Sequence, residues 1–374
     1  MKILHCHCKE TLFIIFSLII LLMTNVYPDY YLGVTTFVQG DTFSYREIAL
    51  FAPSLPDHVI HYHHAQRFFL PYCLGVISKL SGLPLEPLFR VVNLALFFAI
   101  AFIFYRTLKN LNLPNGWLFV ICILVLFNPY VTRYSLSFHF MANSLLFVLG
   151  FLLVCRGFIL NQKSNVFLGL AIAALGRQTA LLLLPTVWFW FYLVWYRQDN
   201  KFSFVIKLIL GSLSVPLIYV IGGIFAAGLG GKNINITTMT GIFASFRDIN
   251  PHEVIVLIEF MIRGLMAHAW IVSLFFAWYL LNDKPKLGSI FWLLVLLSIS
   301  VCIQPVLGGP TTTGNNLVRL VSISHLGFAL AFAIALQSKQ SDLSWRFLFA
   351  VFVLCLIGSM HHRWSLIGEI LHTT

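Results

Sequence analysis

The strongest constraint in this sequence is a series of apolar segments, each long enough to cross a lipid bilayer. A bilayer core takes an apolar helix of about 20 residues. Windows near that length recur along the chain at about 11–26, 88–105, 116–131, 137–155, 179–196, 203–228, 255–281, 288–306, 317–337 and 345–360. Only 10% of the 374 residues are charged, against about a quarter in a soluble domain. The sequence therefore predicts an all-α polytopic membrane protein.

A shorter apolar run, 166–176, decides the predicted topology. Counting it as a short span gives about eleven spans and places the N-terminus in the cytoplasm. Each predicted cytoplasmic connection then carries two basic residues near its span ends, as the positive-inside rule requires. These pairs are Lys2/Lys9, Arg106/Lys109, Arg156/Lys163, Arg197/Lys201, Lys284/Lys286 and Lys339/Arg346. Residues 1–374 form a single membrane domain, with long extracytoplasmic loops at 28–87 and 229–254.

The net charge of +11 at pH 7 does not indicate a nucleic-acid-binding protein. Its basic residues are spread singly along the chain, whereas nucleic-acid binding requires them on one face. The sequence also lacks a Walker A motif, a G-x-S-x-G motif and an H-E-x-x-H motif. The chain therefore lacks the signatures of nucleotide-driven transporters, of serine hydrolases with the second motif and of zincin proteases.

The first long loop contains the stretch VQGDTFSYREIALF, residues 38–51. It places charged and aromatic residues together, and from Asp41 onward it is predicted to be helical. Asp41 has two open interpretations: a helix N-cap, or a general base that takes a proton from an acceptor hydroxyl. Later in this loop, 68–80 is apolar but too short to cross a bilayer, which predicts an interfacial helix.

Histidines and an arginine lie between these two segments of the first loop. His61, His63 and His64 are candidate metal ligands, and His61 and His64 are three residues apart and share one helical face. The sequence offers no further ligand motif, so a divalent metal is possible but not favoured, and no cofactor is predicted. Phosphate binding or helix capping is the preferred role for these histidines. Arg67 is either a snorkelling residue or part of a site.

Two later arginines stand beside apolar runs. Arg177 lies in ALGRQTALLLLP and Arg319 lies in GNNLVRLVSIS. An ionisable side chain at such a place suggests a functional role, and arginine binds phosphate in a bidentate geometry. The alternative is a structural ion pair with an outer carboxylate such as Glu259, which is four residues before Arg263 in a predicted surface helix, 252–263. Phosphate binding is the favoured interpretation of both arginines.

Several sequence phrases, taken in order, resemble the GT-C superfamily of integral-membrane glycosyltransferases, in particular bacterial mannosyltransferase-like members. The first is a GDxxxYxxIA-like phrase, 40–49; the others are HAQRFFLPYCLGVIS at 64–78, FNPYVTRYS at 127–135, LGRQTALLLLP at 175–185 and GNNLVRL at 314–320. The resemblance covers roughly the first 200 residues and, beyond them, only the last phrase. It implies that Asp41 is the catalytic base and that Arg177 and Arg319 bind a lipid phosphate. Residues implied to lie beside them are Tyr45, His64, Arg67 and Asn316.

The resemblance implies an inverting glycosyltransferase in the plasma (inner) membrane, with its active site on the periplasmic or exterior face. Its donor would be a polyprenyl-phosphate-linked sugar and its acceptor a glycan, lipid or protein, with membrane lipids as further partners and no nucleic acid. Two alternatives stay open: a transporter or flippase of a lipid-linked anion, and a polysaccharide polymerase or ligase. The position of the ionisable residues, early in the chain, favours the glycosyltransferase.

Overall fold

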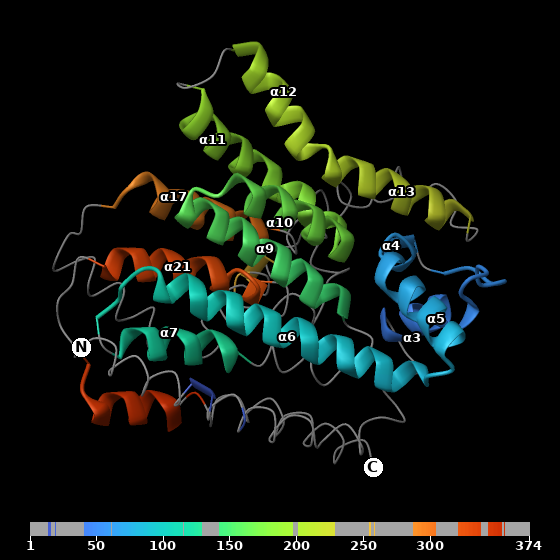
Figure 1. Cartoon of the computed structure of the whole chain (residues 1–374), viewed down its shortest axis with the longest axis horizontal. Coiled ribbons are helices and arrows are strands. Elements are labelled where there is room, and N and C mark those ends of the chain that lie inside the picture. Colours follow the sequence, from blue (N-terminus) through green and yellow to red (C-terminus); the bar gives the residue numbers. More distant parts are fainter. Residues whose placement is uncertain are drawn as a thin grey trace.

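The computed structural model describes a helical bundle (Figure 1). It covers residues 14–15, 19, 41–60, 62–114, 116–128, 142–196, 201–228, 254–255, 258, 287–303, 321–337, 343–353 and 355. Over these residues the regular structure is helical and contains no strand, which confirms the all-α prediction. The elements are α3 (Asp41–Phe51), α4 (Tyr62–Ala65), α5 (Phe69–Ser81), α6 (Leu85–Lys109), α7 (Trp117–Leu126), α9 (Ala142–Leu160), α10 (Lys163–Gly176), the 3-10 helix η2 (Gln178–Leu183), α11 (Leu184–Trp195), α12 (Lys201–Ser212), α13 (Ser214–Gly228), α17 (Ser289–Cys302) and α21 (His325–Leu336).

Three of the described segments are long and apolar enough to cross a membrane: Leu85–Lys109, Ala142–Leu160 and Val205–Gly228. Their presence is consistent with a helical membrane protein. The other apolar helices in the described ranges have 10–17 residues. The count of about eleven spans, and the direction in which each crosses, therefore stay predictions.

Helix α9 is the centre of the bundle, and the other two span-length segments lie at its periphery. In α9, 78% of the most apolar window is buried inside the bundle. The corresponding share is 33% for α6 and 22% for 205–228. The outer helices expose large apolar side chains such as Phe102 on α6 and Leu210 and Ile224 on α12 and α13. Such exposed apolar faces are costly in water and suit a lipid environment.

Helices α9 and α10 form an antiparallel hairpin whose backbones touch through glycine. Gly150 on α9 faces the backbone of Ala173, and a Cβ atom at Gly169 on α10 would lie 2.6 Å from the carbonyl oxygen of Gly150. Gly176 meets the start of α9 in the same way, since a Cβ there would lie 2.6 Å from the carbonyl oxygen of Asn143. Small residues at helix interfaces allow this approach in membrane bundles. The hairpin therefore fixes the C-terminal end of α10 against the N-terminal end of α9.

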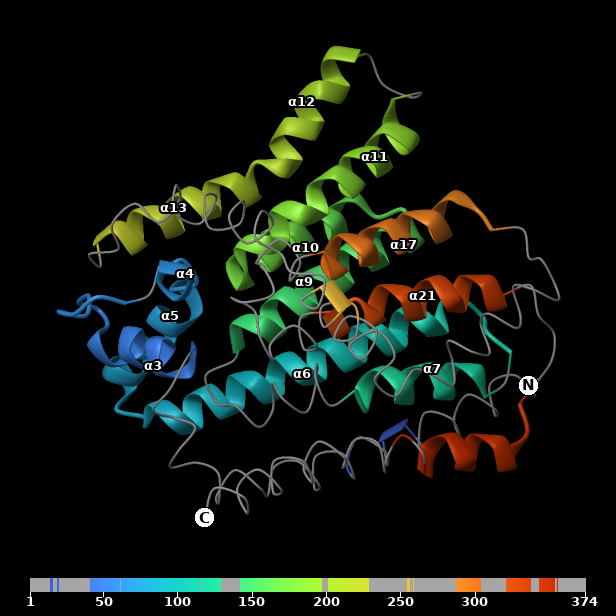
Figure 2. The same cartoon turned by 180° about the vertical axis from the view of Figure 1, so that it is seen from behind.

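The three loop helices α3, α4 and α5 lie together at one end of the bundle, beside the start of α6 (Figures 1 and 2). Helices α3 and α5 cross where Gly75 contacts the backbone of Ala49. On the other side, α13 covers the group: Phe225 stacks on Phe68 with ring centroids 3.8 Å apart. The predicted helices beginning at Asp41 and over 68–80 are confirmed by α3 and α5, whereas 252–263 lies mostly outside the described residues.

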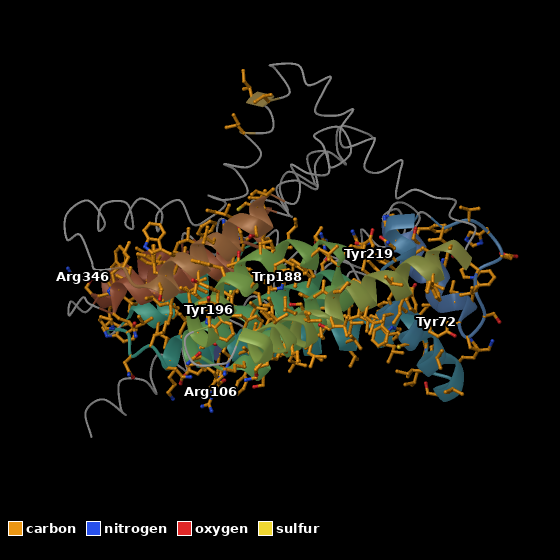
Figure 3. All side chains as sticks on the ribbon, turned by 90° about the horizontal axis from the view of Figure 1, so that it is seen from above. Tyr72, Arg106, Trp188, Tyr196, Tyr219 and Arg346 are labelled. Carbon is orange, nitrogen blue, oxygen red and sulfur yellow. The ribbon has the colours of Figure 1, made fainter. Side chains whose placement is uncertain are left out.

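The opposite end of the bundle carries basic residues. Arg106 and Lys109 are in the last turn of α6, and Lys163 is the first residue of α10. In Figure 3, Arg106 and Arg346 lie toward one end of the molecule and Tyr72 of α5 toward the other. These cations belong to the predicted cytoplasmic set, and which side of the membrane this end faces stays a prediction.

The glycine contact makes a direct prediction for stability. Gly150→Ala is expected to destabilise the protein by about 1–3 kcal/mol, because the added methyl group overlaps backbone atoms that cannot rotate away. The measurement is the thermal unfolding midpoint of the purified protein in detergent. Gly228→Ala is the matched control, since a Cβ there meets only Leu55 Cδ1 at 3.4 Å. Equal midpoints for the two variants would contradict the backbone contact.

Candidate functional site

A group of polar side chains lies where the loop helices meet the α9–α10 hairpin. It combines residues of α3, of α4 and the turn after it, of the start of α9, and of the turn between α10 and η2. We call this group the polar cluster: Ser44, Tyr45, His64, Gln66, Arg67, Asn143, Ser144, Arg177, Gln178 and Thr179.

Arg67 is held in place by two side chains from different parts of the chain. Its Nε–H donates to Oε1 of Gln178 at 2.9 Å, and its Nη1 donates to the hydroxyl oxygen of Tyr45 at 3.1 Å. Tyr45 is fully buried on α3. Both of these partners are neutral, and the two bonds fix the direction in which the guanidinium group points.

Arg177 occupies the break between two helices. Its backbone is extended, with φ −154° and ψ 142°, so α10 ends there and η2 begins at the next residue. The side chain is only 4% exposed, and its Nη2 donates to the hydroxyl oxygen of Ser144 at 2.8 Å. An ionisable side chain so deep in an apolar bundle is costly. This cost favours a functional role for Arg177.

Adjacent residues at the start of α9 hold both arginines. Ser144 accepts from Arg177, and Nδ2 of the preceding Asn143 donates to the backbone carbonyl oxygen of Arg67 at 3.1 Å. Gln178, the residue after Arg177, joins the two from the other side through its bond with Arg67. The fold therefore brings Arg67 and Arg177 to the same turn of α9, although 110 positions separate them in the sequence (177 − 67).

Several buried polar atoms of the cluster have no hydrogen-bond partner among the residues that the structure describes. They include Nε2 of Gln66, Oδ1 of Asn143 and the hydroxyl oxygen of Thr179. Leaving such an atom unpaired costs about 1–3 kcal/mol, and native proteins do so rarely. Unpaired atoms of both donor and acceptor type, in a cluster that also contains Arg67 and Arg177, are suited to a ligand that carries hydroxyl groups as well as negative charge.

His64, which lies on α4, links the cluster to α3. Its Nδ1 lies 2.9 Å from the hydroxyl oxygen of Ser44, and its ring meets that of Tyr45 edge-on with centroids 5.8 Å apart. Asp41 is the first residue of α3, one turn before Ser44 and Tyr45. The description covers the backbone of Asp41 and not its side chain, so its predicted role as general base stays a prediction.

The structure thus brings Tyr45, His64 and Arg67 together with the turn that carries Arg177. Arg319, Asn316 and His61 lie outside the described residues. Within the described ranges, no group of three His, Cys, Asp or Glu side chains is arranged to hold a metal ion.

Sequence reasoning missed four members of the cluster, namely Gln66, Asn143, Ser144 and Gln178. Gln178 directly follows Arg177 and interrupts the same apolar run. This interruption could have indicated a second site residue there. Asn143 and Ser144 lie inside the predicted span 137–155 and were not distinguished from its apolar residues. Gln66 had no signal, because its role depends on a bond from Nε2 of Gln178 to its Oε1, at 2.8 Å.

A second buried polar contact lies within the bundle core, away from the loop helices. Nδ2 of Asn128, just after α7, lies 2.7 Å from Nδ1 of His325 at the start of α21. Both side chains are buried. No predicted site residue takes part in this contact, which ties α7 to α21.

Known proteins give no further guidance to this site. No family model matches the chain, and no curated protein and no solved structure matches it.

Replacing Gln178 tests whether the cluster is held together as described. Gln178→Ala removes partners from both Arg67 and Gln66, a loss of about 1–3 kcal/mol in this region. We expect faster amide hydrogen exchange in peptides covering 41–67, with exchange in α17 unchanged. Gln337→Ala is the control, because Nε2 of Gln337 donates to the carbonyl oxygen of Leu111 at 2.8 Å, outside the cluster. If both variants exchange alike over 41–67, Gln178 does not hold the loop helices.

Proposed function

We propose that the chain is an inverting glycosyltransferase that moves a sugar from a polyprenyl-phosphate-linked donor to a glycan, lipid or protein acceptor. The reaction takes place at the extracytoplasmic face of the plasma (inner) membrane. The observation that carries the proposal is the convergence of Arg67 and Arg177 on one turn of α9. The resemblance of the first 200 residues or so to the GT-C superfamily supplies the reaction type.

The two arginines suit the leaving group of this reaction. As the glycosidic bond to phosphate breaks, negative charge develops on the phosphate oxygens, and fixed guanidinium groups stabilise it. Arg67 is fixed by Tyr45 and Gln178, and Arg177 by Ser144, so little reorganisation is needed when the charge develops. Arg319 is proposed as a third cation for the same phosphate, on the basis of its sequence context.

Asp41 is proposed as the general base. It accepts the proton of the acceptor hydroxyl, the oxygen attacks the anomeric carbon, and the polyprenyl phosphate leaves with the electrons of the broken bond. Direct displacement of this kind inverts the anomeric centre. Support for this role comes from the position of Asp41 in α3, one turn before Tyr45, whose hydroxyl oxygen accepts from Arg67.

One observation favours a second candidate, a transporter or flippase of a lipid-linked anion. Helix α10 stops at Arg177, and η2 and α11 follow after a break in the middle of an apolar region. Transporters use such broken helices to bind substrate near the centre of the bilayer. This candidate shares the phosphate-binding arginines but needs no catalytic carboxylate, so Asp41 distinguishes the two.

The direct test is Asp41→Asn in a transfer assay. Protein reconstituted in liposomes is supplied with a panel of radiolabelled polyprenyl-phosphate sugars, and transfer to acceptor is measured. Loss of the general base is expected to lower the rate about 10²–10⁴-fold, while donor binding is retained because Arg67 and Arg177 are intact.

Glu47→Gln is the matched control, since Glu47 is on the same helix and its carboxylate lies 3.7 Å from Nε2 of His58. This variant is expected to keep the wild-type rate. Wild-type transfer by Asp41→Asn would refute the base assignment. Donor binding without transfer by the wild-type protein would favour the transporter.

A further inference from the structure

Two arginines from different span-length helices lie at the end of the bundle opposite the loop helices. Arg106 is in the last turn of α6, and Arg156 lies near the end of α9. Nη1 of Arg156 donates to the hydroxyl oxygen of Thr107 at 3.2 Å, so it contacts the residue next to Arg106. The guanidinium group of Arg156 therefore lies against the turn of α6 that carries Arg106, which places two positive charges at the same end of two neighbouring helices.

The contact with Thr107 fixes one side of the Arg156 guanidinium. Thr107 is fully buried, and its own hydroxyl donates to the carbonyl oxygen of Ile103 at 2.7 Å, which sets the direction of its lone pairs. Arg156 is half-buried and Arg106 is exposed. Among the described residues, the ion pairs found join His58 to Glu47 and Asp57, and none involves either arginine.

Helix electrostatics explains one cation at each helix end but not this pair. The C-terminal end of a helix attracts a positive charge, and the positive-inside rule places basic residues beside spans. Neither requires the side chain of Arg156 on α9 to bond to the turn of α6 that carries Arg106. An anion that accepts hydrogen bonds from both arginines would balance the two positive charges, and phosphate has the oxygen geometry that guanidinium groups bind best.

The surface of α6 below Arg106 indicates that this anion carries a hydrocarbon chain. Phe98, Phe102 and Arg106 are spaced by four residues and therefore share one face of the helix. Phe98 is 45% exposed and Phe102 is 62% exposed, and the Cζ atom of Arg106 lies 5.8 Å from the centre of the Phe102 ring. Helix α6 has 25 residues, or about 38 Å, so its last turn extends beyond a hydrocarbon core of about 30 Å into the headgroup region.

We propose that Arg106 and Arg156 bind the phosphate of an anionic phospholipid whose acyl chain lies along Phe98 and Phe102. The site is separate from the polar cluster, at the other end of the bundle, and does not depend on the proposed transfer reaction. Its occupant belongs to the membrane leaflet that faces away from α3, α4 and α5.

Native mass spectrometry of the full-length protein tests the proposal. Detergent-solubilised protein is titrated with dimyristoylphosphatidylglycerol or dimyristoylphosphatidylcholine, and the bound lipids are counted. The wild-type protein is expected to retain the anionic lipid about tenfold better than the zwitterionic one. R106Q/R156Q is expected to bind the two lipids within about twofold of each other. The control R346Q removes another cation at the same end and is expected to keep the wild-type preference (Figure 3).

Two results would overturn the proposal. One is a wild-type protein without preference for the anionic lipid, a measurement that needs no variant to fold. The other is an unchanged preference in R106Q/R156Q. In a competition experiment, inorganic phosphate is added at millimolar concentration. We expect it to leave lipid binding intact. Displacement of the lipid by phosphate alone would identify a free-anion site instead.

Discussion

The rest of the structure depends on the backbone contact between α9 and α10. Glycine at 150, 169 and 176 lets the two helices touch along their length, and any side chain there would push them apart. Because α9 is also the most buried of the span-length helices, the hairpin determines where the other helices pack. It also places Arg177 beside Ser144, since α10 ends where α9 begins. The position of this buried charge follows from a packing contact between small residues.

Two pairs of arginines at opposite ends of the bundle differ in how they are held. Arg67 and Arg177 have neutral hydrogen-bond partners from several elements, and unpaired buried polar atoms lie around them. Arg156 contacts the residue next to Arg106, and Arg106 lies beside an exposed aromatic surface. The first environment favours a ligand with hydroxyl groups and a negative charge, and the second favours a lipid headgroup. Such a division suits a protein that handles a charged lipid at one surface and rests in a charged leaflet at the other.

The sequence predicted those features that depend on local pattern. Helices α3 and α5 and the all-helical class follow from hydrophobic periodicity and length, and Arg177 stood out because it interrupts an apolar run. The two glutamines of the cluster, Gln66 and Gln178, could not be assigned to the site this way. Gln178 contacts Arg67 across 111 positions, and its partner Gln66 lies 112 positions away, so nothing in the local sequence of either glutamine indicates the bond. The glycine spacing of seven residues in α10 was visible in the sequence, but its meaning required the facing glycine on α9.

We propose that the polar cluster binds the phosphate of a lipid-linked donor. A cryo-electron microscopy structure of the full chain in a lipid nanodisc, with a non-hydrolysable polyprenyl-phosphonate sugar analogue bound, tests this binding directly. We expect phosphonate oxygens within about 3.5 Å of the guanidinium groups of both Arg67 and Arg177, with the sugar directed toward α3. Density for the phosphonate at another place, with the polar cluster empty, would contradict it.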